Sequence, residues 1–84
     1  AYAAAKGVTI APHWLADVHV HLVAATPNAT HVEFFTDTEV LNLMEVFKTR
    51  LQIKGNGLAI PQEPGIGVVL DEEAVERYSH DGWR

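Results

Sequence analysis

Apolar residues follow two different spacings within the first 35 positions of the chain. Positions 8–12 form a short β-branched run closed by a proline, which is typical of a strand buried on both faces of a parallel sheet. Between positions 14 and 25 the apolar residues recur every three or four positions, which predicts a helix over 14–25. Pro27 ends this helix because the residue before a proline avoids the helical conformation. A second apolar run predicts a strand over 31–35.

The order strand, helix, strand predicts a βαβ unit in residues 1–35. Such a crossover is right-handed and sets its two strands parallel. Two parallel strands cannot bury both of their faces, so the unit requires further strands along at least one edge. The sequence therefore predicts an α/β fold in which this unit is one part of a larger sheet.

The rest of the chain has a less regular pattern. Residues 36–39 have the sequence of a capped helix start, and residues 40–46 form either a short helix or an irregular connection. A Gly-Asn-Gly turn at the centre of 51–60 predicts a β-hairpin. Asp71 is a good helix N-cap, so we expect a terminal helix over 71–80.

The composition limits the class of protein. The 84 residues are 48% hydrophobic and 20% charged, which are the proportions of a globular domain or of part of one. The chain has no cysteine, which excludes a disulfide scaffold and a thiolate metal site and agrees with a cytoplasmic protein. Eleven acidic and six basic residues give a net charge of −5, and no apolar run approaches the ~20 residues of a membrane span. We therefore expect neither nucleic acid nor a membrane as a partner.

Five histidines are a high number for this length, and three of them, His13, His19 and His21, lie close together. A metal site is one interpretation, but on a helix positions 19 and 21 point about 200° apart. The structural interpretation is that His19, His31 and His80 are exposed or pack against the helix. A metal site that uses His19 and His21 stays an alternative.

His13 directly follows the first predicted strand and its closing proline. In parallel α/β folds, ligands bind and catalysis takes place at this end of a strand, and a histidine there can act as a general acid or base. Glu33 lies in the next predicted strand, so the two side chains could face one cleft. A glutamate buried between apolar neighbours is costly unless it is paired or protonated. The alternative is structural: His13 bonds to a loop and Glu33 reaches solvent.

Several runs of the sequence resemble one enzyme family. The runs APHWL at 11–15, HLVAATPNA at 21–29 and VE at 32–33 closely resemble the C-terminal part of the mandelate racemase / muconate lactonizing enzyme family of the enolase superfamily. The tail is similar as well, at LAIP (58–61) and PGIG (64–67), and the resemblance covers essentially the whole chain.

This resemblance implies a fold and a domain organisation. Residues 1–35 would be the last βαβ portion of a TIM-like (β/α) barrel, and residues 36–84 a C-terminal segment that returns to a capping domain. A barrel of this kind takes ~250 residues. The sequence does not begin with methionine, and its one methionine is Met44. We therefore expect the chain to be the C-terminal fragment of a longer enzyme.

The resemblance also implies roles for three residues. Members of the family remove the proton next to a substrate carboxylate and form an enediolate held on magnesium. His13 matches the histidine at the end of the seventh barrel strand, which acts as general base or acid on one face of the substrate. Glu33 matches the last-strand glutamate, which in its protonated form donates a hydrogen bond to the substrate carboxylate. Trp14 either lines the substrate pocket or packs in the core.

The expected function follows from the same resemblance. The family's Mg²⁺ ligands lie on earlier barrel strands, so we expect no metal ligand in this chain. The longer protein would be a magnesium-dependent dehydratase of a sugar acid or hydroxy acid, or a racemase, and the isolated chain would be inactive. Its expected partners are a small carboxylic-acid substrate, the missing N-terminal part of the enzyme and further copies in a homo-oligomer.

A second interpretation is a small stand-alone binding or interaction module that has kept the sequence without the catalysis. Such a module would need to cover its open strand edges, most simply in a symmetric oligomer.

Overall fold

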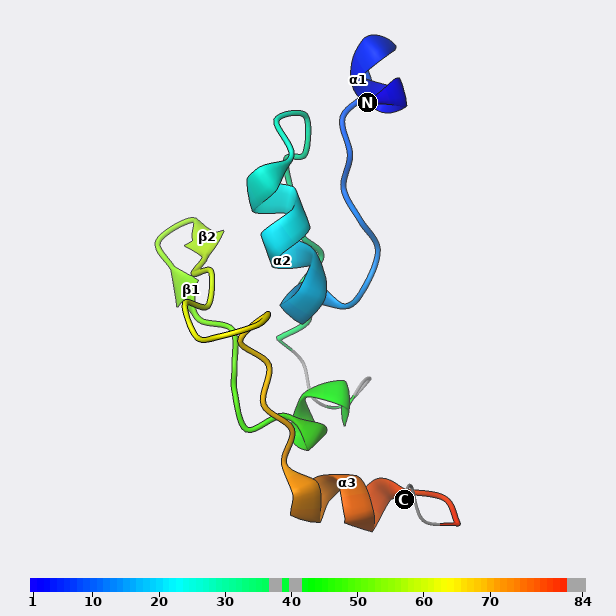
Figure 1. The fold of residues 1–84 in the computed structure, drawn as a ribbon, viewed down its shortest axis with the longest axis vertical. Coiled ribbons are helices and arrows are strands. Elements are labelled where there is room, and N and C mark those ends of the chain that lie inside the picture. Colours follow the sequence, from blue (N-terminus) through cyan, green and yellow to red (C-terminus); the bar gives the residue numbers. More distant parts are fainter. Residues whose placement is uncertain (37–38, 40–41, 82–84) are drawn as a thin grey trace.

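Residues 1–36, 39 and 42–81 are described by the computed structural model of the chain. The described part is elongated, 46 × 28 × 28 Å, with α1 at one end of the long axis and α3 at the other (Figure 1). The expected helix start at 36–39 and the first part of 40–46 fall partly outside the described residues. The elements are α1 (Tyr2–Ala5), α2 (Ala16–Ala25), the 3₁₀ helix η1 (Asn42–Val46), β1 (Ile53–Lys54), β2 (Gly57–Leu58) and α3 (Glu72–Tyr78).

The helix expected over 14–25 begins two residues later, because the chain makes a left-handed turn before it. Trp14 and Leu15 have φ angles of 61° and 46°, so neither belongs to α2. The helix ends at Ala25, and its extended C-cap Thr26 directly precedes the proline. Asp17 lies in the first turn, where a negative charge is favourable to the helix dipole.

The two strands expected over 8–12 and 31–35 are not formed as strands, and that expectation is wrong for the described chain. The first segment forms only an isolated parallel bridge, between Ile10 and Ala29, which lies two residues before the second segment. The backbone N–H of Ile10 donates to Asn28 O (2.9 Å), and that of Thr30 donates to Ile10 O (3.1 Å). The physical reason is that a two-stranded parallel ribbon cannot bury its own faces, and the pairing stops after one bridge.

The C-terminal half contains two short, locally determined elements. Strands β1 and β2 pair antiparallel, with Ile53 opposite Leu58, around a turn in which Gly55 has a φ of 59°. A positive φ at the first central position without one at the second, Asn56, is typical of a type II′ hairpin turn. Helix α3 begins after Asp71, whose carboxylate accepts a hydrogen bond from the backbone N–H of Ala74 at 3.1 Å.

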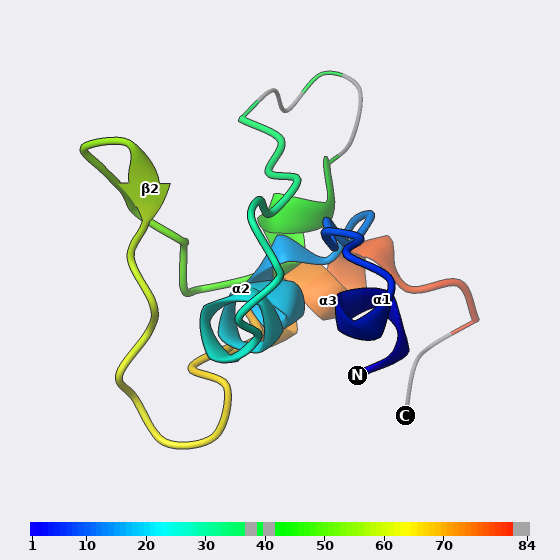
Figure 2. The ribbon, with the colours of Figure 1, turned by 90° about the horizontal axis from the view of Figure 1, so that it is seen from above.

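The hydrophobic core is small and lies beside α2. Ala16 and Val20 of α2 and Leu51 are buried, and Val32, Phe34 and Leu58 pack against them. The hairpin and the chain that follows it lie on one side of α2, as Figures 1 and 2 both show. The radius of gyration is 15.1 Å, whereas a compact domain of this length has about 12 Å. Within the described residues, no helix has the length and apolar character that a membrane span requires.

Candidate active site

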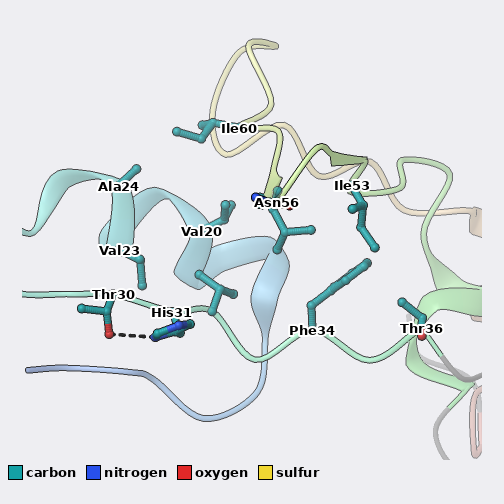
Figure 3. Close-up of a pocket in the computed structure, with 13 residues that line it drawn as sticks. Val20, Val23, Ala24, Thr30, His31, Phe34, Thr36, Ile53, Asn56 and Ile60 are labelled. Carbon is teal, nitrogen blue, oxygen red and sulfur yellow. Dashed lines mark hydrogen bonds between the residues drawn. The ribbon is translucent and has the colours of Figure 1, made fainter.

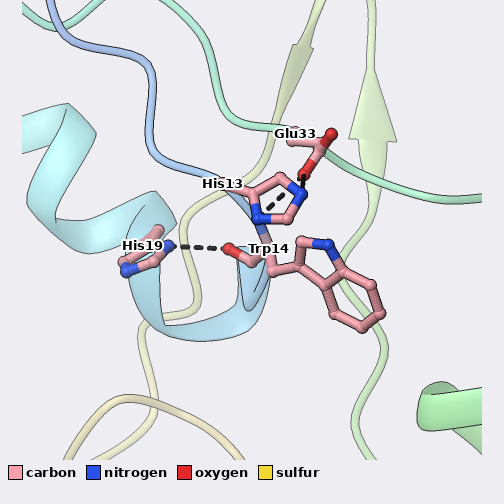
Figure 4. Close-up of polar contacts among 4 residues, drawn as sticks. All are labelled: His13, Trp14, His19 and Glu33. Atoms are coloured by element: carbon pink, nitrogen blue, oxygen red, sulfur yellow. Dashed lines mark hydrogen bonds and ion pairs between the residues drawn. The ribbon is translucent and has the colours of Figure 1, made fainter.

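His13 and Glu33 lie side by side, as the sequence pattern predicts. His13 Nε2 is 3.6 Å from Glu33 Oε2, which is an ion pair when the imidazole is protonated (Figure 4). The His13 side chain is 77% exposed and that of Glu33 is 40% exposed. Glu33 therefore reaches solvent, as in the structural alternative, while the neighbouring Val32 and Phe34 pack toward the core. Both reactive groups are open to solvent from this chain.

The left-handed turn before α2 connects the two residues through the backbone. The N–H of Trp14 donates to Glu33 Oε2 at 2.9 Å, across 19 residues of sequence. A non-glycine residue with positive φ is uncommon, and such residues gather at functional sites. The turn thus directs a peptide N–H at the glutamate while His13, the residue before it, lies next to the same oxygen.

The ring of His19 holds the other backbone group of Trp14, its carbonyl, which belongs to the next peptide unit. His19 Nδ1 lies 2.7 Å from the carbonyl oxygen of Trp14, and because a carbonyl can only accept, Nδ1 is the donor. The sequence pattern predicts for His19 either exposure, packing or, with His21, a metal site, and not this contact. The spacing of five residues carries no signal for this contact, since it depends on the left-handed turn.

The Trp14 side chain lies between the rings of His13 and Phe35. Its indole packs against Phe35 with ring centroids 5.8 Å apart, and it meets the His13 ring edge-on at 5.7 Å. It also lines a cavity of about 30 Å³ together with Glu33, Phe35 and Met44. That volume admits a water molecule, whereas sites for organic ligands are about ten times larger.

A larger apolar pocket, about 430 Å³, lies between α2, the segment 30–36 and the hairpin (Figure 3). Val20, Phe34 and Leu58 belong to its lining, and neither His13 nor Glu33 does. The pocket is therefore separate from the histidine–glutamate pair. At its edge, His31 Nδ1 and Thr30 Oγ1 form a hydrogen bond of 2.9 Å.

The described residues do not form a metal centre. Nowhere among them do three or more histidine, aspartate or glutamate side chains gather closely enough to hold an ion. His19 and His21, the alternative metal pair, each bond to a carbonyl, of Trp14 and of Ile66 respectively, the latter at 2.8 Å. Mg²⁺ requires an octahedral set of oxygen ligands, and Glu33 by itself does not provide one. The chemistry that this arrangement offers is proton transfer and hydrogen bonding by the His13–Glu33 pair.

A histidine beside a carboxylate can act as a general acid–base pair. Residues 1–74 match the family described as Enolase C-terminal domain-like, and the chain belongs to this family. The match confirms the resemblance drawn from the sequence.

The chain is also similar to one curated enzyme. The L-talarate/galactarate dehydratase of Salmonella typhimurium (strain LT2) is 36% identical over 72 residues, which are 86% of this chain and 17% of that relative. The chain therefore spans less than a fifth of the length of the enzyme that it resembles.

Proposed function

We propose that this chain is the C-terminal part of a sugar-acid dehydratase, in which His13 and Glu33 act on the carbon next to the substrate carboxylate. The observation that carries the proposal is the 3.6 Å contact between His13 Nε2 and Glu33 Oε2. The 36% identity to a talarate/galactarate dehydratase supports a hydroxylated dicarboxylic acid as the substrate.

The proposed reaction removes water from two neighbouring carbons. The C–H bond next to the carboxylate breaks and its proton passes to a base. The electron pair forms the C=C bond as the hydroxyl on the next carbon leaves with a second proton, as water. No oxidant or reductant is consumed. The exposed imidazole of His13 takes or supplies one of these protons.

Glu33 has a different part in this proposal. In its protonated form it donates a hydrogen bond to the substrate carboxylate, where negative charge increases as the C–H bond breaks. Magnesium, when bound, supplies further stabilisation of that charge. We assign its ligands to the part of the enzyme outside this chain, as the family resemblance implies.

The exposed apolar surface supports a larger assembly around the site. Val8 is 54% exposed and Leu22 is 58% exposed, on the two elements that flank the turn at Trp14. We propose that the rest of the polypeptide covers these side chains and completes the barrel, excluding water from the histidine–glutamate pair.

The test uses the polypeptide at its natural length, with magnesium and a panel of sugar acids that includes galactarate. We expect His13→Asn to abolish turnover, because an amide cannot exchange a proton near neutral pH, while magnesium binding is retained. Formation of the 2-keto product measures turnover.

His31→Asn is the matched control. His31 lies in the same part of the chain but is bonded to Thr30 and lies outside the pair, so this variant keeps its activity. Near-normal turnover by His13→Asn would overturn the proposed function.

A further inference from the structure

We propose that His19 is the positioning residue of this site: its ring holds the turn that fixes Glu33 beside His13. The inference rests on the proposed function and adds a residue that acts through the backbone of Trp14 rather than on the substrate.

The Trp14 residue is held by hydrogen bonds at both of its backbone groups. Its N–H donates to Glu33 Oε2 at 2.9 Å, and its carbonyl accepts from His19 Nδ1 at 2.7 Å (Figure 4). Removal of the His19 contact would free the carbonyl end and let the N–H turn away from Glu33.

The turn needs such a restraint because its backbone conformation is unfavourable. Trp14 has a φ of 61°, and Leu15 has φ 46° and ψ 51°, a conformation that side chains with a Cβ rarely adopt. Two successive residues of this kind persist only where surrounding contacts determine them.

His19 restrains the turn through two hydrogen bonds. Its backbone N–H donates to Leu15 O at 2.9 Å, as the first turn of α2 requires, and its ring donates to the preceding carbonyl, that of Trp14. One residue therefore fixes two consecutive carbonyls of the turn. Since the Nδ1–H is present in both the neutral Nδ1–H tautomer and the imidazolium, this contact needs no proton transfer by His19.

The turn at Trp14 also determines which oxygen of Glu33 can donate a hydrogen bond. Oε2 faces the Trp14 N–H at 2.9 Å, so it must act as an acceptor there. The carbonyl oxygen of a carboxylic acid accepts more strongly than its hydroxyl oxygen, so this contact favours a proton of Glu33 on Oε1, the oxygen left to face a substrate. His19 thus sets the orientation of the proposed hydrogen-bond donor.

The experiment compares variants of His19 in the natural-length enzyme with galactarate and magnesium. His19→Leu removes the donor, and we expect kcat to fall about 10- to 100-fold with little change in KM, since small displacements of catalytic groups have effects of this size. His19→Asn places an amide nitrogen where Nδ1 was, two bonds from Cβ, and restores most of kcat. His19→Gln places the amide one bond further out and does not.

His21→Leu is the matched control, because His21 lies on the same helix and also bonds to a carbonyl, that of Ile66 at 2.8 Å, away from the turn. We expect its kcat to stay within about threefold of the parent, a much smaller effect than a misplaced catalytic group produces. A second readout is hydrogen exchange of the Trp14 amide in ¹⁵N-tryptophan-labelled enzyme, which accelerates in His19→Gln but not in His21→Leu.

Each outcome decides the inference. An unchanged kcat in His19→Leu, or an equal loss in the asparagine and glutamine variants, overturns it. If the leucine variant does not fold, the asparagine and glutamine variants make the same comparison. If His13→Asn keeps its activity, the proposed function fails, and the Trp14 amide then tests the positioning role by itself.

Discussion

At the scale of the residue, the two oxygens of Glu33 are not equivalent. Oε2 accepts the Trp14 N–H, and Oε1 is left for the proposed contact with substrate. Glutamine can reproduce this arrangement, with its oxygen toward Trp14 and its amide toward the substrate. We therefore expect Glu33→Gln in the natural-length enzyme to lower kcat by less than Glu33→Ala, for which a loss of about 10²–10³ is typical of a lost oxyanion donor.

The measurement is kcat for both variants under the same conditions. Equal losses in the glutamine and alanine variants would show that the hydrogen-bond donor at this position is not what Glu33 contributes.

The sequence predicts that His13 and Glu33 lie close together, but not which atoms meet or how exposed the two side chains are. Their proximity follows from the parallel βαβ pattern, because the segments on either side of the helix run next to each other. The exposure of Glu33 depends on which neighbours pack inward, and the contact of His19 depends on two left-handed residues that no local pattern marks. Backbone strain is maintained by tertiary contacts, which is why it could not be read from the sequence.

At the scale of the element, the irregular loop between the hairpin and α3 depends on Gly67. It is buried, has a φ of 72°, and a Cβ at this position would collide with Pro61. We expect Gly67→Ala to lower the free energy of unfolding by about 1–3 kcal/mol because of overpacking. The left-handed backbone lowers it by about 1–2 kcal/mol more.

Gly65→Ala is the control, because its φ is 71° but a Cβ there meets nothing within 4 Å. It isolates the backbone contribution. Urea denaturation measures both variants, and equal midpoints would show that the contact with Pro61 has no energetic weight.

Helix α3 offers a prediction about a single cap. Asp71 Oδ1 accepts the Ala74 N–H, and loss of such a cap typically costs about 1 kcal/mol. Asp71→Ala should lower the unfolding free energy by that amount and Asp71→Ser by much less. A serine variant as unstable as the alanine variant would contradict the capping role.

The elements that sequence predicts best here are those set by neighbouring residues. The Asp71 cap and the Gly55–Asn56 turn are of this kind, and the observed elements lie where the local signals place them. The strands expected at 8–12 and 31–35 depend on further strands along at least one edge, and the chain forms a single parallel bridge, between Ile10 and Ala29, rather than a sheet.

At the scale of the whole molecule, we expect the isolated 84 residues to be inactive. His13 is 77% exposed, and water around it weakens every electrostatic interaction that the proposed reaction needs. We expect the separately expressed chain to show no turnover of galactarate with magnesium, while the natural-length polypeptide does. Turnover by the isolated chain that disappears in its His13→Asn variant would contradict this.

The short span of the Trp14–Glu33 contact has a consequence for the order of folding. It closes a loop of 19 residues, whereas the His21–Ile66 contact closes one of 45, and the longer closure costs about 0.8 kcal/mol more in chain entropy. The residues proposed to do chemistry can therefore come together while the chain is still leaving the ribosome. On this view the reactive pair is assembled by a local event, and the remaining contacts close around it later.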